Sequence, residues 1–406
     1  MKAYERLLKY VAVHTTSDEN STTVPTAARE FDLAKMLVEE LKAIGVADAA
    51  VDDKCYVYGT LPATPGYEKA AKLGFIAHMD TAPDFSGENV RPRIIENYDG
   101  GDVALGASGR TLSAAQFPHL PDLAGRTLIV TDGTTLLGAD DKAGVAEIVT
   151  MLEEIIREGM PHGKISVGFT PDEEVGSGAD HFDVKRFGAD FGFTCDGGAE
   201  GELEYENFNA AGATFTINGF NIHPGEAKDK MINALLVACE INGMLPKGQT
   251  PRDTAGYQGF WHMVDLSGTT EHASLSYIIR DHDFAGFSRR KETLEKIAAV
   301  MNDTYGAGTV ALSIRDQYRN MKEKIEPCMH LIDNAKRAML DAGVAPRVQP
   351  IRGGTDGARL SYMGLPCPNL GTGGYAFHGP YEHITVEGMD ASVRVLKNLV
   401  AIYRDR

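Results

Sequence analysis

The stretch LGFIAHMD, residues 73–80, decides how the first half of the chain folds. Its first five residues are uncharged and mostly apolar, a composition typical of a short buried strand. His78 and Asp80 follow at the end of this run, and side chains two positions apart point to the same side of a strand. Asp80 can therefore fix the imidazole of His78 while the second ring nitrogen binds a metal.

Three similar runs follow, and helical patterns surround them. We expect buried strands at TLIVT (127–131), ISVGFT (165–170) and FGFTC (191–195). Apolar residues at helical spacing run from Val145 to Gly159, and a similar stripe runs from Phe31 to Gly45. Strands that alternate with helices predict an α/β fold in which helices cover both faces of a sheet.

The pattern changes near residue 208. Alternating strands are predicted at GATFTING (212–219), SLSYIIRDHD (274–283) and GTVALSIRDQY (308–318), with helices at about 229–242 and 289–305. Helical spacing returns after Tyr318 and again at the end of the chain. The simplest layout is a catalytic α/β domain made of residues 1–207 and 318–406, with a smaller inserted α+β domain at 208–317.

Two adjacent aspartates, Asp140 and Asp141, stand between the strand at 127–131 and a helix that starts near Lys142. One carboxylate can cap the helix N-terminus, where negative charge is favourable. The other can then face the edge of the sheet and bridge metal ions. The residues alone leave open which aspartate does which.

An acidic run, TPDEEVGSG (170–178), comes directly after the predicted strand 165–170. Open α/β sheets place their sites at the carboxyl ends of central strands. Adjacent carboxylates such as Glu173 and Glu174 repel each other there unless cations hold them. Asp196 stands in the same position after FGFTC, so the strand ends together predict a metal site.

A last histidine ligand is expected near the C-terminus. His378 lies in the glycine-rich loop GGYAFHGP (373–380), and His383 is its rival five residues on. The remaining histidines, such as His119, His162 and His181, are expected on the surface or in the core.

Composition excludes several classes of protein. Hydrophobic residues at 43% and charged residues at 24% are typical of a globular chain, and its 406 residues exceed one ordinary domain. A net charge of −17 argues against a nucleic-acid partner, which would require clustered Lys and Arg. Five scattered cysteines without a CxxC pair argue against disulfides or a thiolate zinc site. With no signal peptide and no membrane span expected, we predict a cytoplasmic protein without a membrane partner.

Seven motifs together resemble a known family, the dinuclear zinc aminopeptidases, carboxypeptidases and deacylases. They are HMD (78–80), TLLGADDKAG (135–144), TPDEEVGSGAD (170–180), CDGG (195–198), NIHPGEAKDKMINA (221–234), IRGGTDGA (351–358) and FHGPYEH (377–383). The similarity spans essentially the full length in the right order. Within the family, GGDVALG (100–106) and the long insertion between Asp80 and Thr131 are similar to the tripeptide aminopeptidases.

The resemblance implies a zinc-exopeptidase-like catalytic domain and two Zn²⁺ per subunit, with Co²⁺ or Mn²⁺ also accepted. It assigns His78, Asp140 and Asp196 to one ion, and Asp140, Glu174 and His378 to the other, with Asp140 as the bridge. It gives Asp80 the task of orienting His78, and Glu173 that of general base for a zinc-bridging water. It also implies a cis peptide between Asp140 and Asp141. The residue pair Phe377-His378 favours His378 over His383.

The inserted domain would act as a lid and as the dimer contact. His223 matches the residue that stabilises the oxyanion in this family, and Arg280 the one that binds the substrate carboxylate. Gly353, Gly354 and Thr355 would add backbone donors, and Arg352 is a weaker candidate. The resemblance implies small peptides as substrates and a homodimer through the lid, with GATFTING as a strand that could continue a sheet across a two-fold axis.

The expected reaction is removal of the N-terminal residue from tripeptides. The alternative on the same scaffold is a dinuclear-zinc carboxypeptidase or N-acyl amino acid deacylase. A metal-free binding protein is a third reading, but it would have no use for Glu173 or for a complete ligand set.

Overall fold

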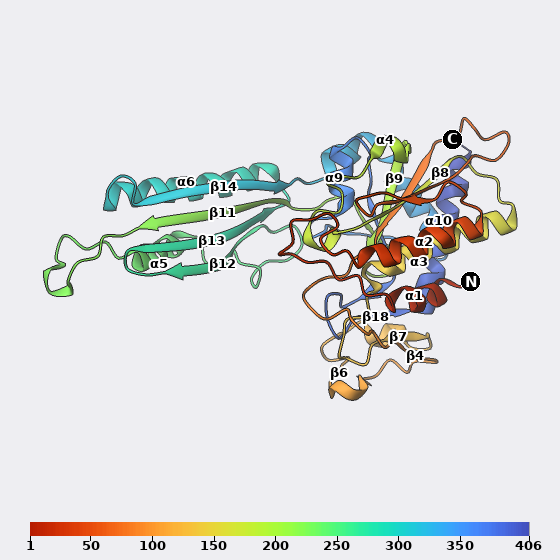
Figure 1. Cartoon of the computed structure of the whole chain (residues 1–406), viewed down its shortest axis with the longest axis horizontal. Coiled ribbons are helices and arrows are strands. Elements are labelled where there is room, and N and C mark those ends of the chain that lie inside the picture. Colours follow the sequence, from red (N-terminus) through yellow and green to blue (C-terminus); the bar gives the residue numbers. More distant parts are fainter. Residues whose placement is uncertain (406) are drawn as a thin grey trace. The chain divides into compact units, whose positions relative to one another are not determined.

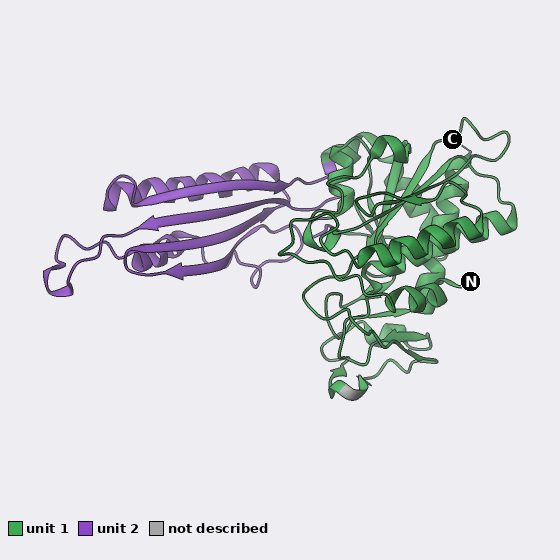
Figure 2. Cartoon of the chain, viewed as in Figure 1, with its two compact units in different colours: residues 1–205, 323–349, 355–406 green, residues 206–322, 350–354 purple. Residues whose placement is uncertain are grey.

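The computed structural model describes residues 1–405, which divide into two compact units (Figure 2). Unit 1 comprises residues 1–205, 323–349 and the chain from 355 onward, and unit 2 comprises residues 206–322 and 350–354. Unit 2 is therefore an insertion in two pieces, one long and one very short. From the sequence we expected the inserted domain at 208–317, and we did not expect residues 350–354 to belong to it.

The central sheet of unit 1 has eight strands in the order β1-β2-β8-β3-β9-β16-β10-β15. They are β1 (Ala50–Val51), β2 (Val57–Leu61), β3 (Leu73–His78), β8 (Ile165–Thr170), β9 (Phe191–Gly197), β10 (Glu202–Glu204), β15 (Arg347–Val348) and β16 (Asn369–Gly371). Two of them, β8 and β9, are labelled in Figure 1. Strands β8, β3, β9 and β16 are parallel, so their carboxyl ends meet at one edge. Every residue of β3 and β8 is buried, as expected for strands covered on both faces.

Helices α2 (Glu30–Ile44), α3 (Ala139–Glu158), α4 (Val184–Phe187), α8 (His330–Asp341) and α9 (Asp356–Tyr362) contact the strands of this sheet. The chain also forms α1 (Ala3–Val11), α7 (Lys322–Ile325) and α10 (Val386–Arg404). Helix α3 packs against β3, β9, α1 and α10, while Phe187 of α4 and Leu360 of α9 form a separate buried cluster with Ile76 of β3. The α/β class predicted from the sequence is confirmed.

A second, antiparallel sheet of unit 1 has the order β17-β18-β7-β4. Its strands are β4 (Arg93–Ile95), β7 (Leu128–Val130), β17 (Gly374–Tyr375) and β18 (His383–Thr385), and β5 (Val103–Ala104) pairs with β6 (Thr111–Leu112) beside it. The run 127–131 is thus a strand, but it lies outside the central sheet. Its partners come from residues 93–95 and 383–385, a pairing that local periodicity does not reveal.

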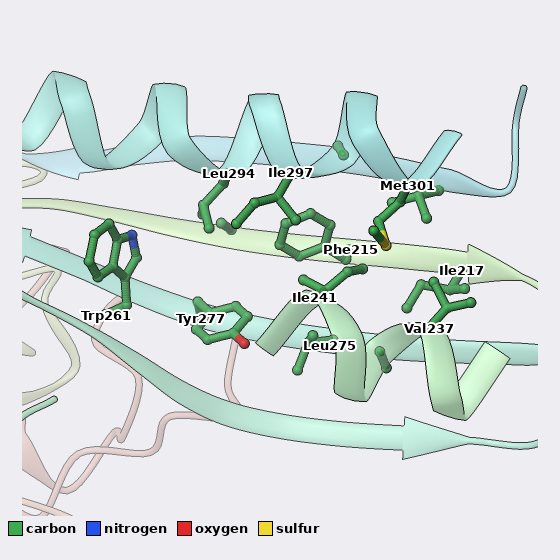
Figure 3. Close-up of a cluster of buried hydrophobic side chains, with 14 of the residues drawn as sticks. Phe215, Ile217, Val237, Ile241, Trp261, Leu275, Tyr277, Leu294, Ile297 and Met301 are labelled. Atoms are coloured by element: carbon green, nitrogen blue, oxygen red, sulfur yellow. The ribbon is translucent and has the colours of Figure 1, made fainter. Parts of the chain in front are cut away.

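Unit 2 is a four-stranded antiparallel sheet with two helices on one face (Figure 3). Its elements are β11 (Asn209–Asn218), β12 (Phe260–Gly268), β13 (His272–Asp281), β14 (Val310–Tyr318), α5 (Ala234–Met244) and α6 (Phe284–Tyr305), with strand order β12-β13-β11-β14. Buried residues alternate with partly exposed ones along β13, because only one face meets the helices. Phe215, Leu275 and Ile241 belong to the core between sheet and helices.

Three features of unit 2 differ from the sequence expectation. Strand β12 was missed, because all but its first two residues are exposed and no burial alternation marks it. The two helices begin at Ala234 and Phe284 rather than near 229 and 289, because Asn233 and Asp283 cap them.

Within residues 1–405, none of the helices combines the length and apolar character that a bilayer span requires.

Candidate metal centre

His78 ends β3 at the carboxyl edge of the central sheet and is only 2% exposed. Its Nδ1 lies 3.1 Å from the backbone oxygen and 3.3 Å from Oδ1 of Asp80. Its Nε2 lies 3.0 Å from Oδ1 of Asp140 and 3.3 Å from Oδ1 of Asp196. When Nδ1–H donates to Asp80, the lone pair of Nε2 faces two carboxylates, the arrangement of a metal-binding imidazole.

Asp80 also holds the acidic turn that follows β8. Its Oδ1 accepts the backbone N–H of Glu173 at 3.0 Å and its Oδ2 that of Glu174 at 3.1 Å. Both carboxylates therefore start from a backbone that is fixed relative to His78. This second task of Asp80 was not expected from the sequence.

The structure distinguishes the two adjacent aspartates, whose connecting peptide is cis as expected. Asp141 accepts the N–H of His78 at 3.1 Å and that of Gly144 at 3.2 Å, so it caps the helical part of α3. Asp140 instead lies between two imidazoles, with Oδ1 at 3.0 Å from His78 Nε2 and Oδ2 at 3.2 Å from His378 Nε2. Gly144 is required here, since a Cβ would come within 1.9 Å of the carbonyl oxygen of Cys195.

Glu174 and His378 complete a second group around Asp140. Oε2 of Glu174 lies 3.0 Å from Nε2 of His378, and Oε1 of Glu174 is buried without a hydrogen-bond partner. His378 stands at a φ of 61° in its glycine-rich loop, with Nδ1 3.6 Å from Oδ2 of Asp84. A buried carboxylate oxygen without a donor is costly unless a cation binds it.

The charges of this group shift the pKa values of its members. Although burial alone would lower it, the carboxylates of Asp196, Asp140 and Asp80 raise the pKa of His78 well above its usual value. Hydrogen bonds to Asp140 and Glu174 raise the pKa of His378 to about 11. Burial raises the pKa of Glu174 to about 8 and that of Asp196 to about 6, with Asp140 adding to both. Without a metal ion, protons on the imidazoles must balance these carboxylates.

Two overlapping groups of these donors could each hold a metal ion. One set is His78, Asp140 and Glu174, and another is His78, Asp141 and Asp196, with the ligand atoms of each set within 4.8 Å of one another. Asp141 is a poor ligand because both its oxygens already accept backbone N–H groups, so Asp140 takes its place in our assignment. Imidazole and carboxylate donors of this kind suit zinc, and also cobalt or manganese.

His383, the rival of His378, lies elsewhere. It is fully buried, its Nδ1 donates to the carbonyl oxygen of Tyr381 at 2.7 Å, and its ring stacks on Tyr375 and His119. The Nε2 atoms of His383 and His119 are 2.9 Å apart, so one donates to the other. His162 is also buried, His181 is exposed, and none of these histidines joins the cluster.

His223, Arg280, Arg352, Gly353 and Gly354 all belong to unit 2. His223 is exposed and its Nδ1 accepts the N–H of Gly225 at 3.2 Å, which leaves its proton on Nε2. Arg280 lies on β13, where Nη1 donates to the carbonyls of Ile279 at 3.0 Å and Ala211 at 3.4 Å. Gly354 packs against Tyr318, whose ring would lie 3.0 Å from a Cβ at this position.

Thr355 and Arg352 have clear structural contacts. Thr355 belongs to unit 1 and its hydroxyl accepts the N–H of Gly357, which caps α9. Arg352 donates to the carbonyls of Gly256 and Gln258 at 2.7 and 3.0 Å, so it ties a loop of unit 2 rather than forming an ion pair.

Two buried carboxyl groups near the cluster were not singled out from the sequence. Asp356, at the start of α9, is 4% exposed, and burial raises its pKa to about 7. Glu382, four residues after His378, is 1% exposed. Their only sequence signal was an acidic residue inside a glycine-rich motif and inside FHGPYEH.

Comparisons with known proteins identify a matching family model, full-length relatives and similar solved structures. The model of the family described as Peptidase family M20/M25/M40 matches residues 131–402. Peptidase T of Clostridium perfringens is 55% identical over 406 residues, covering 100% of both chains, and peptidase T of Alkaliphilus oremlandii is 52% identical over 402 residues, covering 98% of each. The crystal structure of the aminopeptidase PepT from Bacillus cereus has a TM-score of 0.79 at 22% identity, covering 100% of this chain and 98% of that one. A tripeptidase structure from Staphylococcus aureus has a TM-score of 0.80 at 20% identity, with the same coverage.

Proposed function

The chain belongs to peptidase family M20/M25/M40, and from this membership we propose that it is a metal-dependent aminopeptidase that removes the N-terminal residue of tripeptides. The observation that carries the proposal is the position of Asp140 between His78 and His378, which makes one carboxylate common to two ligand sets. The full-length identity to proteins named peptidase T supports the choice of substrate class.

Two zinc ions are the proposed cofactor. His78 and Asp196 would hold one, Glu174 and His378 the other, and Asp140 both. The ions would lower the pKa of a nucleophilic water and polarise the scissile carbonyl. The unpartnered Oε1 of Glu174 supports a cation at the second set, because its burial otherwise has no compensation.

Glu173 is the proposed general base and acid. Its backbone N–H donates to Asp80, and among the described residues its carboxylate forms no ion pair with His78 or His378, so we take it to be available for proton transfer. Burial and the neighbouring Asp196 raise the pKa of Glu173 well above its usual value. A carboxylate of raised pKa takes the proton of the water more readily and later delivers it to the leaving amine.

Substrate recognition is assigned to His223, Arg280, Gly354 and Thr355. With Nδ1 occupied by Gly225, His223 presents Nε2–H as a donor suited to a developing oxyanion. Arg280 uses Nη1 for backbone carbonyls and rests over the ring of Tyr318 at 5.3 Å, which orients its planar fork toward a carboxylate. Backbone N–H groups at Gly354 and Thr355 would complete the contact.

The test is product analysis with peptides of defined length. Leu-Gly-Gly should yield leucine and glycylglycine, while Leu-Gly, Leu-Gly-Gly-Gly and N-acetyl-Leu-Gly-Gly should be poor substrates. Release of the C-terminal glycine would support a carboxypeptidase, and hydrolysis of N-acetylleucine a deacylase. Chelation should abolish the activity and Zn²⁺ should restore it.

We also propose a homodimer through unit 2. The expected continuation of a sheet through GATFTING is wrong, because β11 lies between β13 and β14. The open edges are β12 and β14, and β12 exposes Met263, Val264 and Leu266 along an edge that carries only one charge, Asp265. An unprotected apolar edge favours pairing with a second copy.

The proposed dimer would let His223 serve the partner's metal centre. Mixing Glu173→Ala and His223→Ala chains tests this, because exchange then creates heterodimers in which one site keeps both groups. Recovery of activity supports the arrangement in trans. No recovery, with heterodimers verified, would leave His223 serving its own chain.

A cytoplasmic location remains our proposal as well. All five cysteines are free thiols, which suits a reducing compartment. Fractionation of the source cells with an antibody against the chain would test it.

A further inference from the structure

Glu382 fills an anion site made by the chain itself. Its carboxylate accepts the backbone N–H groups of Leu137 at 2.7 Å, Gly138 at 2.8 Å and Asp140 at 3.0 Å. Gly138 has a φ of 79°, the left-handed conformation in which successive N–H groups converge on an anion. Among the described residues Glu382 has no salt bridge, so its buried carboxylate is compensated by these three hydrogen bonds together with the electrostatic attraction of the buried Lys142.

The hydrogen bonds of Glu382 join two loops that carry proposed metal ligands. One end of the contact is the loop that carries Asp140, and the other is the loop that carries His378, four residues before Glu382. Asp140 and His378, which these loops carry, are two of the three proposed ligands of the second ion; the third is Glu174. No regular strand pairing joins the two loops directly, since β7 and β18 pair through residues 128–130 and 383–385.

The first ligand set is anchored differently. His78 ends β3 and Asp196 lies in β9, and both strands are held in register within the central sheet. Their spacing therefore depends on the sheet rather than on Glu382. Only Asp140 is a proposed ligand of both ions. The adjacent Asp141 is held independently of Glu382, because it accepts the backbone N–H groups of His78 and Gly144.

We propose that Glu382 is a positioning residue that holds the Asp140 loop and the His378 loop together and so sets the affinity of the second metal ion selectively. The inference rests on the proposed dinuclear centre. A purely structural role would lower stability or weaken both ions alike. A positioning role predicts a difference between the two ions and a partial recovery when the carboxylate is kept.

The test is titration of the metal-free protein with Co²⁺, followed by calorimetry and by visible absorption of the bound ion. The wild type should take up two ions in resolvable steps. In Glu382→Gln, an NH₂ group that cannot accept hydrogen bonds replaces one carboxylate oxygen. The second ion should therefore bind about 10–100-fold more weakly, while the affinity for the first ion should stay close to that of the wild type. Glu382→Asp keeps the charge on a shorter side chain and should recover part of the affinity.

Glu387→Gln is the matched control. Glu387 also accepts a backbone N–H with both oxygens, that of Thr127 at 2.9 and 3.1 Å, but it touches neither ligand loop. Its Co²⁺ titration should equal that of the wild type. Thermal unfolding of each metal-free protein shows whether it is folded. If Glu382→Gln does not fold, the Co²⁺ titration of Glu382→Asp tests the role of Glu382 instead.

The outcomes separate the inference from its premise. If the wild type binds fewer than two ions, the dinuclear centre fails and the inference with it. If the wild type binds two ions while both Glu382 variants match it, weaken both ions equally, or are matched by Glu387→Gln, only the role of Glu382 is overturned.

Discussion

The two units bury side chains of opposite kinds. In unit 2, Phe215, Leu275, Ile241 and their neighbours fill the space between one face of the sheet and two helices (Figure 3). At the carboxyl edge of the unit 1 sheet, the side chains removed from water include His78 and Asp80. Apolar burial stabilises a fold by roughly 25 cal/mol per Å², whereas burial of charged groups costs stability unless partners compensate.

This difference separates what each region contributes. The core of unit 2 is expected to carry stability and no chemistry. The cluster of unit 1 is expected to carry chemistry at some cost in stability, offset by backbone N–H donors, by protons or by metal ions. Substitutions in the two regions should therefore change different measurements.

The largest effect is expected from Glu173→Ala. Loss of a general base should lower kcat by about 10²–10⁴-fold, while Co²⁺ uptake and the free energy of unfolding stay near those of the wild type. Steady-state kinetics, metal analysis and urea unfolding measure the three quantities. Glu174→Ala, the control, should lose the second ion. Equal metal loss in both variants would contradict the division of roles between these neighbours.

Phe215→Ala should have the converse effect. Removing a fully buried aromatic ring costs about 3–5 kcal/mol, and the loss should fall on unit 2, whose Trp261 is the only tryptophan of the chain. Urea unfolding followed by tryptophan fluorescence would detect it, with Co²⁺ uptake unchanged. Leu236→Ala on α5, 66% exposed, should cost less than about 0.5 kcal/mol. Comparable losses for the two variants would contradict the core assigned to this sheet.

His383 allows a test by pH, because burial lowers its pKa to about 4. The unfolded chain, with a histidine pKa near 6.5, then binds the proton first as pH falls. The native state should therefore lose about 2–3 kcal/mol between pH 6.5 and 4 through this group. His383→Asn keeps a donor for Tyr381 without titrating, so its metal-free unfolding free energy should fall less steeply. Parallel curves would show that His383 is not the buried neutral imidazole described here.

The smallest effect concerns Arg280 in unit 2. If it binds the substrate carboxylate, C-terminal amidation should slow the wild type by about 10–100-fold, the loss of one charged hydrogen-bond partner. Amidation should barely affect Arg280→Ala. Comparing kcat/KM for Leu-Gly-Gly and its amide in both proteins measures this. If amidation lowers kcat/KM equally in both proteins, Arg280 does not bind the substrate carboxylate and only forms its hydrogen bonds to the backbone.

The sequence predicted best where one physical rule dominates. The strands at 73–78, 165–170 and 191–195 are confirmed, because continuous apolar runs suit strands buried on both faces. Residues after such strands meet at one edge when the strands are parallel, and His78, Glu174 and Asp196 do lie near one another. Asp140, at the start of α3, and His378, in the loop between β17 and β18, join them from outside the central sheet. Their roles as ligands remain predictions.

The rest depended on contacts between distant parts of the chain. Strand β16 lies inside a glycine-rich segment, and it becomes a strand only through its partners β9 and β10. Glu382 meets Asp140 across 242 positions, which no periodicity can reveal. The exposed edge strand β12 has no alternation of buried and exposed residues to mark it.

The insertion of unit 2 into unit 1 also has a consequence for synthesis. Unit 2 is nearly contiguous and can fold as soon as residue 322 has left the ribosome, whereas the sheet of unit 1 stays divided until β16 arrives to join β9 to β10. At roughly 5–20 residues per second, this delay after residue 205 lasts about 10–30 s. During that time the edge of β9 that pairs with β16 remains open. We expect the nascent chain to depend on chaperones chiefly in this interval, with the inserted unit already folded at its end.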